Sequence, residues 1–301
     1  MMAYSQNLAA ALHSMWQPQP TADGSFTFYS PEFGETFHSL GGARQEAFEK
    51  FAIATDLPRK AQASHLRLLD ICYGLGYNTA AALEVIWQHN PTCQVTVIGL
   101  ELDLGVPQAA LAVMPPWPAS VQGILEGLAQ QQQVTTPSCE ARLLIGDARQ
   151  TIQDLVRQGF QADAIFLDPF SPQRCPQLWT VEFLRLVAQC LAPAGHLATY
   201  CRAAAVRSAL QAAGLHLGTL PIVAPQHSHE WAQGTVARWQ ADQLIPLSLM
   251  EQEHLQTRAG IPYRDPHLRD SAEMIRSRRQ AEQQTANRES TSRWRHRWGI
   301  T

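Results

Sequence analysis

The sequence has no long hydrophobic run. None of its segments approaches the roughly 20 consecutive apolar residues that a membrane-spanning helix needs. The N-terminal residues also lack a basic segment followed by an apolar core and a cleavage site. We therefore expect a cytoplasmic protein that does not interact with membranes.

Paired cysteines are absent too. The six cysteines are scattered, with no Cys-x-x-Cys pair and no paired histidine spacing, which argues against a zinc site and against a disulfide framework. We therefore expect no metal cofactor. Several of these cysteines fall in predicted strands, where they would serve as small core residues.

Lysine is missing from the C-terminal tail, which is nevertheless basic. Between Arg258 and Arg297 there are ten arginines and five acidic residues, whereas the rest of the chain carries a net charge of −8. Arginine forms bidentate bonds with phosphate and stacks on bases better than lysine does. The tail therefore suggests an anionic partner, although a solvated helix would show the same composition.

The central part of the sequence alternates strand-like and helix-like runs, from RLLDICY to GTVARW. This alternation predicts an α/β fold with a mostly parallel sheet covered by helices on both faces. The last two runs, HLGTLPIV and GTVARW, have no helix between them and should pair antiparallel. Seven strands with such an end pair resemble the Class I (Rossmann-like) S-adenosylmethionine-dependent methyltransferase fold.

Three segments follow from these patterns. Residues 1–60 form an N-terminal extension, with a loose helix before a Pro-rich break, a strand at Ser25 to Tyr29 and a helix from about Ala43. Residues 61–240 form the Rossmann-like domain. Residues 241–301 form an Arg-rich helical extension.

The stretch LRLLDICYGLGYNTAAAL predicts a strand, a glycine turn and a helix. Gly74 and Gly76 can adopt positive φ and let a flat ligand approach the backbone, although many α/β turns need glycine only for packing. The motif ends at Thr79 rather than at a third glycine, which disfavours NAD and favours S-adenosylmethionine. We place Asn78 with the two glycines in this cofactor site.

Acidic residues end the next two predicted strands. Glu101 follows Gly76 by 25 residues, where it can accept hydrogen bonds from ribose hydroxyls or start a helix. Asp147, with Ala148 beside it, can accept the adenine amine or cap the next helix. Because strand ends share one edge of a parallel sheet, we predict that these residues bind one cofactor.

The fourth predicted strand ends in FLDPFSPQRCPQLWT. Its Asp168-Pro169-Phe170 resembles the signature of enzymes that methylate amino groups, with one proline instead of two. A carboxylate can hold an amine by accepting its N–H, and a rigid proline with an aromatic ring restricts the approach. We predict that Asp168 is catalytic; alternatively, it only stabilises the turn.

The motifs FYSPEFGETFHS, LDICYGLGYNT, GLELD, GDAR and LDPFSPQRCPQLWT together resemble the methyltransferase half of the bacterial tRNA 5-methylaminomethyl-2-thiouridine family, MnmC. The resemblance covers about residues 25 to 240. It implies methylation of the 5-aminomethyl group of wobble uridine, with S-adenosylmethionine as cofactor and Asp168 as the substrate-orienting acid. The chain departs from the family at three points. It has no room for the FAD-dependent oxidase domain of the bifunctional members. Cys175 stands where many members carry Asn, and the loop HSHEWAQG lacks the basic residues expected there.

The family resemblance also implies that tRNA is the partner, through its anticodon stem-loop. The arginines of the tail would contact phosphates, and Trp294 or Trp298 would stack on a base or simply pack on the domain. A monomer is favoured. The predicted substrate-binding residues are Tyr29, Phe170, Pro172, Trp179, Arg276, Arg278 and Arg279.

Two other functions fit the same sequence. One is a polyamine aminopropyltransferase or small-molecule amine methyltransferase, which would share the strand order and the acid. The other is a non-catalytic RNA-binding protein on a methyltransferase fold, which would not bind the cofactor.

Overall fold

The computed structural model describes residues 16–220 and 233–300. The chain forms two compact units, residues 1–151 and 152–301, which are described separately. This division lies within the predicted central domain, and the boundaries at residues 60/61 and 240/241 stay predictions. The helix predicted at the N-terminus and most of the HSHEWAQG loop lie outside the described residues.

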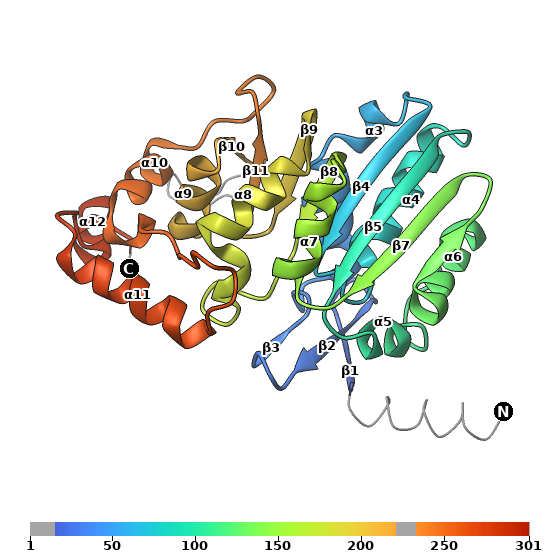
Figure 1. Ribbon diagram of the computed structural model, residues 1–301, viewed down its shortest axis with the longest axis horizontal. Coiled ribbons are helices and arrows are strands. Elements are labelled where there is room, and N and C mark those ends of the chain that lie inside the picture. Colours follow the sequence, from blue (N-terminus) through green and yellow to red (C-terminus); the bar gives the residue numbers. More distant parts are fainter. Residues whose placement is uncertain (1–15, 221–232, 301) are drawn as a thin grey trace. The chain divides into compact units, whose positions relative to one another are not determined.

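The first unit contains a parallel sheet whose strands end level with one another. Strands β4 (His65–Ile71), β5 (Gln94–Glu101) and β7 (Cys139–Ile145) pair in that order, and β6 (Gln133–Thr135) adds an antiparallel edge that the sequence did not predict (Figure 1). The register places Ile71 opposite Leu100 and Glu101 opposite Ile145. The residues that follow these strands therefore emerge at one edge.

Helices of the first unit pack through small and apolar residues. They are α3 (Leu57–Lys60), α4 (Tyr77–His89), α5 (Gly105–Ala110) and α6 (Ala119–Gln131). Helix α4 buries a run of three alanines, Ala80 to Ala82, which lets neighbouring elements approach closely. The Pro-rich segment between α5 and α6 separates the two helices.

The N-terminal extension of the first unit is a small antiparallel sheet followed by a helix. Strands β1 (Pro18–Pro20), β2 (Phe26–Ser30) and β3 (Glu35–Thr36) pair in that order. Helix α2 (Ala43–Glu46) continues into a π-helical segment, η1 (Ala47–Ile53), that packs on α4. The predicted strand and helix are thus present.

The second unit contains the antiparallel end pair. After α7 (Ala148–Arg157), which crosses the division between the units, β8 (Ala162–Leu167) pairs parallel with β9 (Leu191–Thr199). Strand β11 (Thr235–Arg238) lies antiparallel between β9 and β10 (His216–Thr219). The predicted antiparallel pairing of the last two strands is confirmed.

The other elements of the second unit are helices, most of which have a side-chain cap at their first turn. They are η2 (Pro176–Trp179), α8 (Val181–Gln189), α9 (Ala204–Ala212), α10 (Leu249–Gln256), η3 (Arg258–Gly260), α11 (Ala272–Thr285) and α12 (Thr291–Trp298). A serine or threonine side chain accepts a backbone N–H at the start of α8, α10, α11 and α12. These caps explain why the polar tail forms ordered helices.

A buried ion pair fastens the tail to the second unit. Nη1 of Arg207, on α9, donates to Oε1 of Glu251, on α10, over 2.9 Å, and both side chains are almost fully buried. The same guanidinium donates to Oγ1 of Thr235 and to the carbonyl of Gly234. Because every one of these donors has a partner, the charge is compensated.

Neither a membrane helix nor a metal cluster occurs in the part of the chain that the structure describes. No helix there is long and apolar enough to cross a membrane. Nor do three His, Cys, Asp or Glu side chains come together there as a metal site would require.

Candidate cofactor and substrate sites

The glycine turn after β4 has a left-handed backbone. Cys72, Gly74 and Gly76 have φ values of 65°, 55° and 86°. A Cβ atom on Gly76 would lie 2.6 Å from Oη of Tyr73, so the turn closes over its own tyrosine. Both the backbone conformation and this contact require glycine at position 76.

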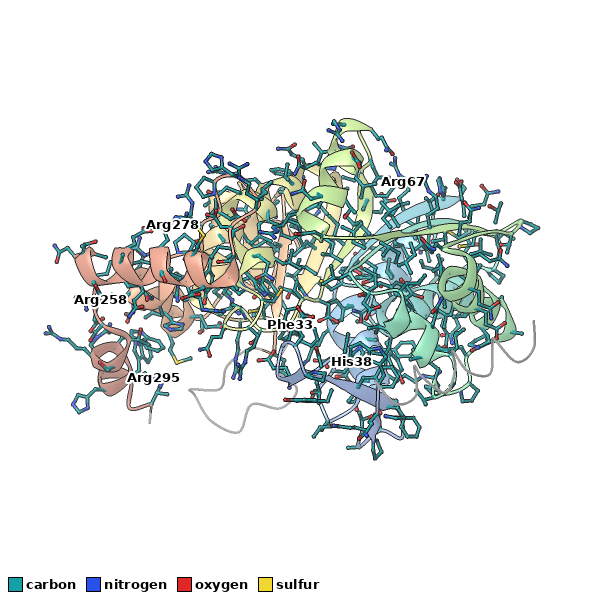
Figure 2. All side chains as sticks on the ribbon, turned by 60° about the horizontal axis from the view of Figure 1, so that its bottom comes forward. Phe33, His38, Arg67, Arg258, Arg278 and Arg295 are labelled. Atoms are coloured by element: carbon teal, nitrogen blue, oxygen red, sulfur yellow. The ribbon has the colours of Figure 1, made fainter. Side chains whose placement is uncertain are left out.

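The N-terminal sheet covers this turn. A Cβ atom on Gly74 would lie 3.4 Å from Cδ1 of Phe37, and Oη of Tyr77, the first residue of α4, accepts the backbone N–H of Phe26. His38 contacts the ring of Tyr77 edge-on, with 5.1 Å between ring centres. Figure 2 labels His38 on this segment. The FYSPEFGETFHS motif is therefore part of the wall around the turn.

Glu101 joins the glycine turn to the end of β5. Its Oε2 atom accepts the backbone N–H of Gly74 over 2.8 Å, and Oε1 accepts those of Leu102 and Asp103 over 2.8 and 2.9 Å. Burial raises the pKa of this carboxyl group, and the three hydrogen bonds from backbone N–H groups oppose that rise. A carboxylate has about four acceptor positions, so one is left for a ribose hydroxyl.

Asp70 is a second buried acid at this turn, and it was not identified from the sequence. Its Oδ2 atom accepts the Thr79 hydroxyl over 2.7 Å, whereas Oδ1 has no hydrogen-bond partner among the described residues. Burial, together with the charge of Glu101, raises the pKa of Asp70 to about 7. An acid inside an otherwise apolar strand, four residues before Gly74, was the signal in the sequence.

The carboxylate of Asp147 is bonded to Arg149, two residues further along the chain. Both of its carboxylate oxygens lie 3.1 Å from Nε of Arg149, and Oδ2 lies 2.7 Å from Nη2 of that residue. Oδ1 also accepts the backbone N–H of Arg149 at the start of α7. These bonds match the helix-capping alternative, and the adenine contact stays a prediction. Asn78 and Ala148 are buried, and their roles in cofactor binding stay predictions too.

The turn after β8 is held at two carbonyl groups. The indole N–H of Trp179 donates to the carbonyl of Phe170, and the hydroxyl of Tyr200 donates to that of Pro169, each over 2.8 Å. The two rings meet edge-on, with centres 6.3 Å apart. Asp168 is half-buried beside this clamped turn. The backbone is thus rigid where the predicted catalytic carboxylate begins.

Trp179 was predicted to bind substrate, but its side chain is fully buried. Its indole N–H is bonded to the Phe170 carbonyl, so its role in binding the substrate stays a prediction. Tyr200, which is bonded to the Pro169 carbonyl, was not identified from the sequence. Of the other predicted substrate residues, Tyr29 is 44% exposed on β2 and Pro172 is half-buried.

The three predicted RNA-binding arginines of α11 have partners within their own unit. Arg276 donates to the carbonyl of Gln173, and Arg278 to the carboxylate of Asp270. Arg279 donates to the carbonyls of Ile261 and Ala259 and lies over the ring of Tyr263. These contacts hold the tail in place, and a role in RNA binding stays a prediction.

The predicted stacking of Trp294 on a base is wrong. The side chain is fully buried and stacks on His254, with 4.4 Å between ring centres. Trp298 is half-buried and donates its indole N–H to Glu253. The packing alternative therefore holds for Trp294.

The buried acids of the first unit fit S-adenosylmethionine. Asp70 and Glu101 are both buried at the glycine turn, and the charge of Glu101 raises the cost of ionising Asp70. A ligand that brings positive charge and O–H or N–H donors would relieve this cost. S-adenosylmethionine carries a sulfonium, an ammonium and two ribose hydroxyls, whereas the pyrophosphate of NAD would add negative charge.

Comparisons with known proteins agree with this assignment. Residues 114–233 match the model of a family described as S-adenosyl-L-methionine-dependent methyltransferase. The fold is similar to the crystal structure of MnmC2 from Aquifex aeolicus, with a TM-score of 0.78 and 30% sequence identity, over 90% of this chain and 86% of that one.

Curated relatives are longer than this chain. The bifunctional tRNA 5-methylaminomethyl-2-thiouridine biosynthesis protein MnmC of an Acidovorax species is 29% identical over 71% of this chain and 35% of the relative. The protein of the same name from Methylibium petroleiphilum is 30% identical over 63% of this chain and 30% of the relative. The chain thus spans about a third of the length of these two relatives.

Proposed function

The chain belongs to the MnmC-like family of S-adenosylmethionine-dependent methyltransferases, and we propose that it methylates the 5-aminomethyl group of the wobble uridine in tRNA. The product would be 5-methylaminomethyluridine, with or without a 2-thio group. The relatives named for this pathway support the choice of substrate. The observation that carries the proposal is the Asp168-Pro169-Phe170 turn, whose two carbonyls are held by Trp179 and Tyr200.

The first unit would hold the cofactor. When bound, S-adenosylmethionine supplies an electrophilic methyl group on its sulfonium. The backbone of Gly74 and Gly76 allows close approach, and the open acceptor position of Glu101 suits a ribose hydroxyl. Asp70 and Glu101 favour the positive charge of the ligand. Asp147 and Ala148 would lie at the adenine end.

The second unit would hold the amine. The Asp168 carboxylate would accept an N–H hydrogen bond and thereby orient the nitrogen lone pair. An alkylamine has a pKa of about 10, and a neighbouring carboxylate favours the ammonium form. The amine must therefore lose a proton to water before it reacts. Because Asp168 is half-buried rather than sealed, water can reach this position.

Methyl transfer to tRNA that carries 5-aminomethyluridine tests the proposal. Wild-type protein and the variants Asp168→Ala and Asp168→Asn are incubated with labelled S-adenosylmethionine and the RNA, and nucleosides are analysed by mass spectrometry. We expect 5-methylaminomethyluridine with wild type and at least about a hundredfold slower formation with either variant, since positioning contributes factors of this size. Equal rates in wild type and Asp168→Ala would refute the role of Asp168.

The same assay separates the other candidate functions. Activity on putrescine or another small amine without RNA would indicate a small-molecule enzyme. Calorimetry that detects no binding of S-adenosylmethionine would indicate a non-catalytic RNA-binding protein. A strain that lacks the gene should accumulate 5-aminomethyluridine in its tRNA, and a normal nucleoside profile would contradict the proposed substrate.

A further inference from the structure

The second unit contains a cavity that the proposed reaction does not use. Its volume is about 400 Å³, within the range typical of ligand pockets. The walls come from the segment after β9, from α10 and from α12. The lining residues are Tyr200, Cys201, Arg202, Ala203, His254 and Arg295.

The cavity is lined by positive charge without a carboxylate. Arg202 and Arg295 are its two ionic residues. Glu251, an acid on α10 whose charge acts on Arg202, is bonded to Arg207 through Oε1 and to Ser248 through Oε2. Partial burial lowers the pKa of Arg202, and the positive charge of Arg207 lowers it further, whereas the charge of Glu251 opposes this shift. An anionic ligand would relieve this repulsion.

His254 adds a neutral polar group. Burial, together with the charges of Arg207 and Arg295, lowers its pKa to about 4, so the imidazole is uncharged at neutral pH. Its ring is held in place by stacking on buried Trp294. A neutral imidazole can donate one hydrogen bond to a phosphate or accept one from a sugar hydroxyl.

One wall of the cavity is bonded directly to the proposed substrate turn. Tyr200 lines the cavity, and its hydroxyl donates to the carbonyl of Pro169, next to Asp168. A ligand in the cavity would therefore lie beside the residues that hold the target amine. For an RNA substrate, the chemical group next to the target nucleotide is a backbone phosphate.

We propose that this cavity binds a phosphate group of the substrate RNA chain adjacent to the target nucleotide. The inference rests on the proposed function and names the part of the substrate that the second unit recognises. Two guanidinium groups suit a phosphodiester, because each can form paired N–H bonds with its oxygens. Backbone contacts of this kind set the register of an RNA without reading its sequence.

The cavity differs from the rest of the Arg-rich tail. Arg278 and Arg279 on α11 donate to groups of their own unit, and Arg297 on α12 pairs with Glu253 and Glu289. Arg295 is exposed, and among the described residues no carboxylate forms an ion pair with it. Figure 2 shows Arg278 on the long helix of the tail and Arg295 on the helix that follows.

Fluorescence anisotropy with a labelled anticodon stem-loop RNA tests the proposal. The full-length variants are Arg295→Ala, Arg202→Ala and, as a matched control, Arg288→Ala, which removes an exposed arginine of the same tail that does not line the cavity. We expect the first two to raise Kd at least about tenfold and to reduce the salt slope by about one, with no change for the control. Arg295→Lys should keep the slope but recover only part of the affinity.

Two further measurements keep the outcomes distinct. Calorimetry with S-adenosylmethionine should give the same Kd for all variants, and melting temperatures should agree with wild type, since both arginines are exposed. Equal RNA affinity for Arg295→Ala and Arg288→Ala would overturn the inference while leaving the proposed function intact. Wild type that binds the cofactor but neither binds nor methylates the RNA would overturn the proposed function itself.

A small anion, such as a free phosphate ion, would satisfy the two arginines of the cavity in the same way as an RNA phosphate. Inorganic phosphate is therefore titrated in a melting assay with wild type and Arg295→Ala. Stabilisation that needs Arg295, combined with RNA binding that does not, would identify the cavity as a small-anion site and refute the RNA assignment. Competition between phosphate and RNA that depends on Arg295 would support it.

Discussion

Replacing Asp70 by asparagine should stabilise the protein at alkaline pH and weaken its cofactor binding. The carboxyl group is fully buried, and one of its oxygens has no partner among the described residues. Its pKa is about 7 in the folded chain, against an ordinary value of 3.8 for an aspartate side chain. Asparagine has nearly the same shape and does not ionise, so it removes the cost of burying the charge.

The sign and size of the effect follow from proton linkage. Because the folded-state pKa is raised, the unfolded chain loses this proton first, and stability falls as pH rises from about 4 to about 7 and is constant above. The difference of about three pKa units lowers the free energy of unfolding of the wild type by about 4 kcal/mol at pH 8.5 and by about 2 kcal/mol at pH 5, relative to a chain in which this group does not ionise. The advantage of Asp70→Asn over wild type should therefore grow by about 2 kcal/mol between these two pH values.

Urea unfolding followed by circular dichroism at pH 5 and pH 8.5, without cofactor, measures this difference. Glu140→Gln is the control, because Glu140 is exposed on β7 and its replacement should change stability little at either pH. An advantage of Asp70→Asn that is the same at both pH values would refute the assignment of a buried, ionising Asp70. Calorimetry at pH 8.5 should show weaker binding of S-adenosylmethionine to Asp70→Asn, since the attraction for its positive charge is lost.

Three further changes test other parts of the structure. Glu251→Ala leaves Arg207 buried without its partner and should cost about 3 to 5 kcal/mol in urea unfolding, whereas Glu253→Ala, on the same helix, should cost much less. Trp179→Phe removes the bond to the Phe170 carbonyl; we expect a loss of about 1 kcal/mol of stability but a larger loss of methyl transfer, and unchanged kcat would contradict the positioning role. Gly76→Ala meets Tyr73 at a positive φ and should abolish cofactor binding measured by calorimetry, whereas Gly123→Ala, in open space on α6, should not.

Much of the fold was predictable because it depends on local sequence patterns, namely apolar runs and the residues that follow them. Apolar runs that end in Gly74, Glu101 and Asp147 identified strands whose ends share one edge, and the pairing of β4, β5 and β7 confirms that edge. The sequence predicted the antiparallel pair β10 and β11 because it shows no helical pattern between the last two strand-like runs. These features depend on residues close together in the sequence, and they point to one fold class.

The partners of individual side chains were decided only by the tertiary structure. Composition could not show that Trp294 is buried against His254, or that Arg278 and Arg279 bond to their own unit while Arg295 lines a cavity. The sequence pattern shows Asp70 only as one residue of an apolar strand. The structure shows that its Oδ1 atom is buried without a hydrogen-bond partner among the described residues. The reason is physical: hydrophobic periodicity is a property of neighbouring residues, whereas burial, charge compensation and hydrogen bonding depend on residues that folding brings together.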